Sequence, residues 1–417
     1  MTLSSYSLPT RDASGEHVRD EVPQLGQEAF IGLPSRFVHS FRAHTSPEVL
    51  LLTFLTWTGA YVGRQRYVRL AGCRVWGNLF LLQVGEGLHP AVAAVEGFFE
   101  WSGRHPLMLR SGLTSGQSLV WHVRDPLQRF DKVLVRRRPP VWDRTTVDGG
   151  TVERRLIVAQ PSLVRILSRN TQAALSLRET LVDGFRGRNL AQYMSHRDGG
   201  YLESSGPHVV VAAACEPQEL LTLPKEFGAL CLIAAEGGCP VFGGLPPSDA
   251  DKFMELQTEF WDVLEDRSLS EITLAPATAR IFERALSRAG PGEREASALK
   301  LAKLGLVYAL LNGSAQLSAE HAAAAVSVLR YSDAVRQHLT AGINTARVAA
   351  RIDAALRHCP RGLTRTQLNR RLNGKAKAAV IDAAFEQLAR SGRARREFHR
   401  TPGRSAERWY PEGGEAA

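Results

Sequence analysis

The chain has few cysteines and no long apolar run. Its five cysteines are scattered over 417 residues without CxxC spacing, which excludes a recognisable zinc motif and predicts buried, reduced thiols. Crossing a bilayer takes about 18 consecutive apolar residues, and the best candidate, residues 49–62, is shorter and contains threonines. The N-terminus carries no signal-peptide pattern. We therefore expect a cytoplasmic protein without membrane contact, disulfides or a metal site.

Lysine is absent from the chain before Lys132, and this absence matters at one loop. Residues 78–84 form a strand-like apolar run, a turn with Gly85 and Gly87 follows, and a helix-like apolar stretch begins at residue 91. This is the layout of a nucleotide phosphate loop, which reads G-x-x-x-x-G-K-[ST]. Its backbone N–H groups cradle phosphate, its Lys meets the charge, and its Ser or Thr holds Mg²⁺.

The residue types that phosphate chemistry needs are missing from this loop. Where the second Gly, the Lys and the Ser/Thr would stand, the chain has Pro90, Ala91 and Val92. Pro90 also lacks an N–H donor, and no small shift of register supplies a lysine. The sequence predicts an ATPase framework without its ATPase site, with no catalytic residue and no cofactor.

Hydrophobic patterning divides the chain into four parts. Residues 1–24 are polar and irregular, which indicates a flexible lead-in. Residues 25–245 alternate helical stretches with short apolar runs at 156–159, 208–214 and 229–235, as in strands buried on both faces of a mostly parallel sheet. Residues 246–342 show only helical periodicity and predict an all-α subdomain that ends at a hinge, Ala341-Gly342. Residues 343–417 form a separate basic module.

The basic module holds most of the net charge. Residues 345–417 contain 16 of the 52 Lys/Arg and 7 of the 42 Asp/Glu, a net +9 of the total +10. Helical patterns at 345–358, 365–372 and 376–390 precede two strand-like stretches, 393–400 and 405–410, which flank Thr401-Pro402-Gly403. Three helices and a basic hairpin predict a winged helix, a helix-turn-helix with an added wing.

Two groups of cations are the candidate DNA-binding residues. The first stands at the start of the presumed recognition helix and the second lines the wing. The first group is Arg370, Arg371, Lys375 and Lys377, and the second is Arg395, Arg396, Arg400, Arg404 and Arg408. The recognition helix also carries Asp382 and Glu386, so we favour phosphate contacts by the wing over base readout by the helix. A winged helix used for protein contacts is the alternative.

Several segments together resemble a family of P-loop proteins. They are 29–33, 46–63, 78–80, 111–116, 123–126 and 308–314. They look like the RecA/DnaB-type proteins of phages, plasmids and integrated elements, which are often associated with a primase and described only as a domain of unknown function. The resemblance implies a RecA-like core with helices on both faces of its sheet, a helical subdomain, a terminal winged helix, and the activity of an ATP-dependent helicase motor.

The chain differs from that family at the positions of the family's nucleotide-binding and catalytic residues. Beyond the phosphate loop, the family's two acidic residues after its Walker B strand correspond to Gln160 and Ser162. Its polar sensor falls at about Ala214, and its arginine finger falls near Ala229-Leu230. Losing the cation clamp and the finger costs on the order of 10³–10⁵ in rate. We therefore expect no turnover.

Three functions follow as hypotheses. The first is a non-hydrolysing DNA-binding accessory to the replication or maintenance of a mobile element, acting as a homo-oligomer or beside an active replication protein. The alternatives are a helicase with an atypical phosphate site and a winged-helix transcriptional regulator. Among isolated residues, His89 and Arg136–Arg138 are more simply solvated loop residues, and Glu216 is more simply an acid in a helix first turn than a base.

Overall fold

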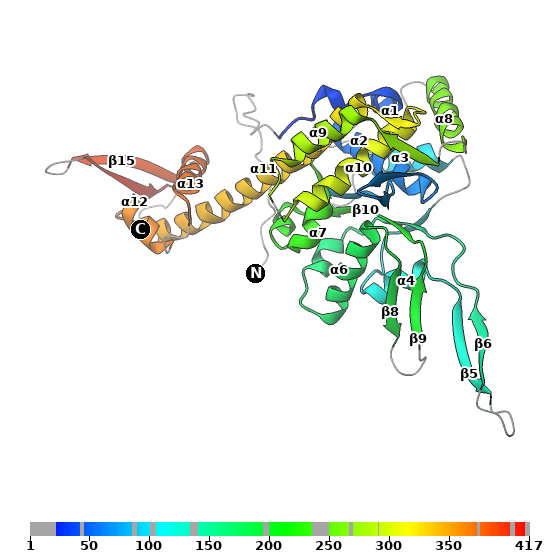
Figure 1. Ribbon diagram of the computed structural model, residues 1–417. Helices are drawn as coiled ribbons and strands as arrows, with labels where there is room; N and C mark the ends of the chain where they lie inside the picture. The colour runs from blue at the N-terminus through cyan, green and yellow to red at the C-terminus, as the bar shows by residue number, and fades with distance from the viewer. Residues whose placement is uncertain are drawn as a thin grey trace. The chain divides into compact units, whose positions relative to one another are not determined.

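The protein divides into two compact units, Met1–Val335 and Arg336–Ala417, and Figure 1 labels their elements. The computed structural model describes residues 22–41, 46–85, 90–100, 106–133, 141–194, 200–235, 250–266, 270–290, 292–372, 376–400 and 405–412. Most of the predicted lead-in, 1–24, lies outside them. Within the described segments, no helix combines the length and apolarity that a membrane crossing needs.

A five-stranded parallel sheet forms the centre of the first unit. Its strands, in spatial order, are β11 (Leu232–Ala235), β3 (Phe80–Val84), β10 (His208–Cys215), β7 (Arg155–Val158) and β4 (Leu107–Leu109). All neighbouring pairs are parallel. Every residue of β3, β10 and β11 is buried, which explains why their sequences are mostly apolar and do not alternate with polar residues. The predicted α/β fold with a parallel sheet is confirmed.

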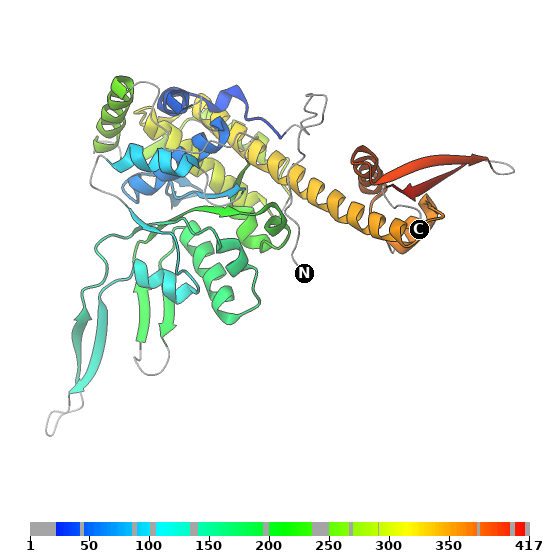
Figure 2. The same ribbon diagram turned by 180° about the vertical axis from the view of Figure 1, so that it is seen from behind.

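Helices cover both faces of this sheet. On β10, the His208 ring bonds to the carbonyl of Gly59 in α2 (Pro47–Val62). The next residue, Val209, lies against Gly184 of α6 (Gln172–Phe185). Successive strand residues face opposite ways, so α2 and α6 lie on opposite faces, as Figure 2 also shows from behind. As predicted, α2 starts after Ser46 and stops at Gly63.

Ten further helices among the described residues complete the helical part of the first unit before α11 (Ala319–Arg357). They are η1 (Gln27–Ala29), α1 (Gly32–Phe41), α3 (Pro90–Phe99), α4 (Gly116–His122), α5 (Leu163–Leu167), η3 (Pro217–Leu221), α7 (Lys225–Leu230), α8 (Ala250–Glu265), α9 (Pro276–Leu286) and α10 (Arg294–Leu311). Helices α1, α2, α3 and α8 share an aromatic core in which Phe54 contacts Phe37, Phe98 and Phe260. The apolar run 229–235 is a strand only in its second half, because α7 extends to Leu230.

A second sheet corrects the prediction that residues 246–342 are all-α. This sheet has the order β13 (Gln316–Leu317), β12 (Glu271–Leu274), β1 (Tyr67–Leu70) and β2 (Cys73–Val75). Strands β12 and β13 belong to the predicted helical segment, yet β12 pairs with β1, about 200 residues earlier in the chain. Strands of two to four residues are too short to show a period of two, so the sequence pattern missed them.

Two antiparallel hairpins extend from the first unit. One joins β5 (Leu127–Val133) to β6 (Val141–Asp148), and the other joins β8 (Leu190–Met194) to β9 (Gly200–Ser204). Both views show them at the same end of the unit. The first spans residues 127–148. Its tip, which includes Arg136–Arg138, lies outside the described residues.

Helix α11 (Ala319–Arg357) corrects the prediction of a hinge at Ala341-Gly342. It runs for 39 residues without a break and includes most of the helix predicted at 345–358. The two compact units meet inside it, between Val335 and Arg336. A single glycine in a helix costs only about 1 kcal/mol, which good helix formers on both sides offset.

The second unit contains the three predicted helical segments and the predicted hairpin. After the end of α11 come β14 (Leu363–Thr364), α12 (Arg365–Arg371), α13 (Ala378–Arg390), β15 (Ala394–Arg400) and β16 (Ser405–Pro411). The strands form an antiparallel sheet of order β14-β16-β15. Its core includes Ile352, Leu368 and Ile381, and the Trp409 ring stacks on Phe385 with centroids 4.3 Å apart.

Candidate functional site

The carboxyl ends of β3, β10 and β7 meet at one edge of the parallel sheet, where open α/β sheets usually bind ligands. The Gly85 N–H, just after β3, donates to the Cys215 carbonyl of β10 at 3.0 Å. A cavity of about 190 Å³ lies at this edge, smaller than the roughly 300–1,000 Å³ of ordinary ligand pockets. Its lining is Gly85, Pro161, Ser162, Arg165, Ala214, Cys215, Glu216 and Glu219.

The structure brings only some of the predicted nucleotide-site positions together. Gly85 and Ser162 line the cavity. Pro90 begins α3, and Ala91 and Val92 are buried in that helix rather than in the cavity wall. Gly87 and His89 lie outside the described residues.

Gln160, which follows β7, is bound to the backbone of a distant segment. Its Oε1 accepts from the Leu113 N–H at 3.0 Å, and its Nε2 donates to the Leu113 carbonyl at 3.3 Å and to the Ser162 hydroxyl at 3.3 Å. The side chain is 4% exposed. A carboxylate here would have no proton for the Leu113 carbonyl, so the amide fixes the 113 segment instead of facing the cavity.

An ion-pair cluster occupies the cavity mouth. Arg165 of α5 pairs with both Glu216 and Glu219, and these pairs raise the pKa of its guanidinium. Glu216 is also the N-cap of η3, where it forms a capping box with Glu219, in agreement with the predicted role of a helix-start acid. Two carboxylates against one cation leave a net negative charge, which opposes the binding of a polyphosphate.

Neither Cys215 nor the residues at the predicted sensor and arginine-finger positions supply a reactive nucleophile or a cation. Burial raises the pKa of the Cys215 thiol to about 12, so it stays protonated at neutral pH. The side chains at the predicted sensor and arginine-finger positions, Ala214 and Leu230, are apolar and buried. Among the described residues, no group of His, Cys, Asp or Glu could hold a metal ion.

In the second unit, the predicted cations near α12 and α13 differ in their contacts. Arg371 donates to the Ala355 carbonyl at 3.3 Å and to the Cys359 sulfur at 3.1 Å, so it helps to fix α12 against the end of α11. Arg370 and Lys377 are exposed. Lys375 lies outside the described residues.

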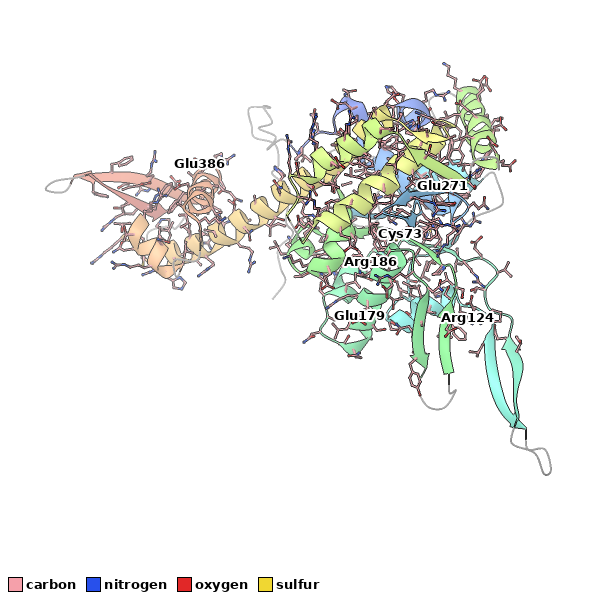
Figure 3. All side chains as sticks on the ribbon, in the orientation of Figure 1. Cys73, Arg124, Glu179, Arg186, Glu271 and Glu386 are labelled. Carbon is pink, nitrogen blue, oxygen red and sulfur yellow. The ribbon has the colours of Figure 1, made fainter. Side chains whose placement is uncertain are left out.

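Acidic residues stand on α13, as predicted from the sequence. Asp382 forms an ion pair with Arg365 at 2.5 Å. Glu386 is exposed on the same helix and is labelled in Figure 3. Neither side chain suits the approach of a phosphate backbone.

The C-terminal hairpin (β15 and β16) separates its arginines onto two faces. Arg395 lies opposite Tyr410, and Arg396 lies opposite Trp409, so the two arginines face opposite ways. Arg408 lies opposite Glu397 and therefore shares the Arg395 face. The backbone of Arg400 pairs with Ser405 in the register that places it on the Arg396 face, and Arg404 lies outside the described residues.

Aromatic residues accompany the arginines on both faces, and the sequence reasoning assigned them no role. The Arg396 guanidinium lies 5.0 Å from the centre of the Phe398 ring, and that of Arg395 lies 5.4 Å from the Tyr410 ring. Phe398 is 61% exposed. The alternation of Arg396, Phe398 and Arg400 was the available signal, because an outward aromatic between cations is unusual in a strand that only supports a core.

Comparisons with known proteins give a distant likeness. No protein-family model matches the chain, and no curated protein matches it. Among solved structures, a full-length MCM homolog from Methanopyrus kandleri is similar with a TM-score of 0.42 and 14% identity, over 73% of this chain and 59% of that one. The chain therefore spans less than two thirds of that protein's length. The proposed function therefore depends on the residues of this chain and not on that likeness.

Proposed function

We propose that this chain is a DNA-binding protein in which a P-loop-type core has lost ATP hydrolysis and a winged helix grips DNA phosphates. The resemblance of its sequence to proteins of mobile elements favours an accessory role in the replication or maintenance of such an element. The core would then serve assembly with copies of itself or with an active replication protein.

The distribution of charge carries this proposal. Residues 336–417 hold 17 Lys/Arg and 7 Asp/Glu, a net charge of +10 that equals the charge of the whole chain. The first unit is therefore neutral overall. A basic module on a neutral body is typical of nucleic-acid binding, and the attraction to phosphate is its main source of affinity.

The order of elements supports the winged-helix interpretation. The end of α11, β14, α12, α13 and the β15–β16 hairpin follow one another as helix, strand, two helices and wing. Among the described arginines of the hairpin, Arg395 and Arg396 form exposed ion pairs, with Glu397 at 2.8 Å and with Glu407 at 3.9 Å, and Arg408 donates to the Arg361 carbonyl at 3.2 Å. Such pairs contribute about 0–1 kcal/mol, so they exchange readily for contacts with phosphate.

Replacing three hairpin arginines tests the proposal. In the full chain, Arg395→Gln, Arg396→Gln and Arg408→Gln together should weaken DNA binding and lower the slope of log K against log salt by about 2 to 3. Fluorescence anisotropy over a series of salt concentrations measures both. The control removes equal charge from exposed positions of the first unit, two in α9 and one just after it: Arg280→Gln, Arg284→Gln and Arg288→Gln.

The control triple should bind DNA like the wild type. Equal binding by the hairpin triple and the wild type would refute the proposal. DNA-stimulated ATP hydrolysis would favour the helicase alternative. Binding confined to one DNA sequence, with little dependence on salt, would favour the transcriptional regulator.

A further inference from the structure

Phe398 is an exposed large hydrophobic residue among the described residues of the C-terminal hairpin. It is 61% exposed, and the Arg396 guanidinium lies 5.0 Å from its centre. Burying a phenylalanine ring stabilises a folded protein, and this ring gains little of that stabilisation within the chain because most of it is exposed. A single exposed apolar residue needs no explanation by itself, but this one stands among cations.

The register of the hairpin shows that Phe398 lies just beyond the hydrophobic core of the second unit. Phe398 lies opposite Glu407 and on the same face as Ala394, Arg396 and Trp409. Ala394 and Trp409 are buried against the helices. The core therefore covers this face up to Trp409, and Phe398 is the first aromatic ring beyond it.

The aromatic residue on the opposite face is already engaged. The Tyr410 hydroxyl bonds to His399 Nε2 at 2.6 Å, and the Arg395 guanidinium lies over its ring. The side chain of Tyr410 is also partly buried. Phe398 also has an arginine over its ring, but it is the more exposed of the two aromatics and therefore has more open ring surface for a planar partner.

We infer that the hairpin binds single-stranded DNA, with an unpaired base stacked on Phe398 and the neighbouring phosphates held by Arg396. This inference rests on the proposed DNA binding and adds the form of the DNA. Base–aromatic stacking beside cations is how proteins bind single strands without reading their sequence, and each stacked base contributes substantially to affinity.

The charges of α13 favour a single strand over a duplex. Docking that helix in a major groove would bring Asp382 and Glu386 close to two phosphate backbones. Wedging Phe398 into a duplex would also require unstacking of base pairs, which opposes binding. An unpaired base meets the ring without that cost.

Substitutions of Phe398 and of Arg396 distinguish base stacking from phosphate contacts in DNA binding. In the full chain, Phe398→Ala should weaken binding of an oligothymidylate of about 12 nucleotides by roughly 5- to 100-fold, with the salt slope unchanged. Phe398→Trp should keep the affinity. Arg396→Gln should instead lower the slope by about 0.7. Leu175→Ala, at an exposed apolar position of the first unit, is the matched control and should behave like the wild type.

An abasic oligonucleotide with the same number of phosphates gives a second readout. The wild type should bind it as weakly as Phe398→Ala binds the oligothymidylate, and the variant should show no further loss. Unchanged binding by Phe398→Ala overturns the inference, and so does tighter binding of a duplex that depends on Phe398. If the arginine triple does not weaken DNA binding, the proposed function is refuted. If the arginine triple weakens DNA binding and Phe398→Ala does not, only the stacking of a base on Phe398 is refuted.

Discussion

His208 shows how a single buried residue can set the response of this protein to acid. It lies on β10, its Nε2 is 2.8 Å from the Gly59 carbonyl, and it is 3% exposed. Burial lowers the pKa of its ring to about 3, although the hydrogen bond to Gly59 partly opposes this. The folded protein therefore keeps this ring neutral at pH values where the unfolded chain protonates it.

The sign of the effect follows from that difference. Because the pKa in the folded state is about 3 and the ordinary value is near 6.5, the unfolded state takes up a proton first as pH falls. Stability is then lost from about pH 6.5 downward. Between pH 6.5 and pH 5 the loss from this group should be about 2 kcal/mol.

His208→Gln tests this prediction, because glutamine retains a donor for the Gly59 carbonyl and does not titrate. Urea unfolding at pH 6.5 and pH 5, followed by tryptophan fluorescence, gives the free energy of unfolding. The wild type should lose about 2 kcal/mol more than the variant over that interval. Equal losses would mean that His208 is protonated in the folded protein.

The sequence predicted the long or fully buried elements and missed those that depend on distant partners. Strands β3 and β10 are recognisable from their predominantly apolar sequences, and helix α2 from its Ser46-Pro47 start. The β1–β12 pairing and the bonds of Gln160 to Leu113 are not recognisable in this way, because pairing partners far apart in the chain leave no local pattern. The sequence showed that carboxylates are missing after β7, because that is a local feature. It did not show that Arg165 forms ion pairs with Glu216 and Glu219, because these residues lie about 50 positions further along the chain.

At the scale of elements, α11 makes a specific prediction at the position that was expected to be a hinge. Gly342 is exposed, and a Cβ added there would meet no atom within 4 Å. Gly342→Ala should therefore stabilise the protein by about 0.5–1 kcal/mol, since alanine loses less backbone entropy in a helix. A change in the midpoint of urea unfolding measures this.

Gly313→Ala is the matched control, because Gly313 ends α10 with a φ of +60°, where a side chain is strained. It should destabilise the protein by a similar or larger amount. Loss of stability on Gly342→Ala would show that residues 341–342 leave the helical conformation in solution.

At the scale of the whole molecule, the parallel sheet and the electrostatics of its carboxyl edge lead to the last prediction. The cavity at this edge is about 190 Å³, its mouth holds the Arg165–Glu216–Glu219 cluster, and no lysine precedes Lys132. ATP with Mg²⁺ should therefore leave the thermal unfolding temperature unchanged, whereas a ligand at 100 times its Kd would add about 2.7 kcal/mol. Hydrolysis should be absent with and without DNA.

Two variants sharpen this test. Ala91→Lys restores a lysine to the loop sequence, but Ala91 is fully buried in α3, so the variant should lose stability rather than gain ATP binding. Glu216→Gln with Glu219→Gln removes the repulsive carboxylates and should still give no hydrolysis, since the cation clamp stays absent. An ATP-dependent rise in the unfolding temperature of the wild type would contradict the proposed loss of the nucleotide site. It would not bear on the proposed DNA contacts of the second unit, because the hairpin arginines lie in a separate compact unit.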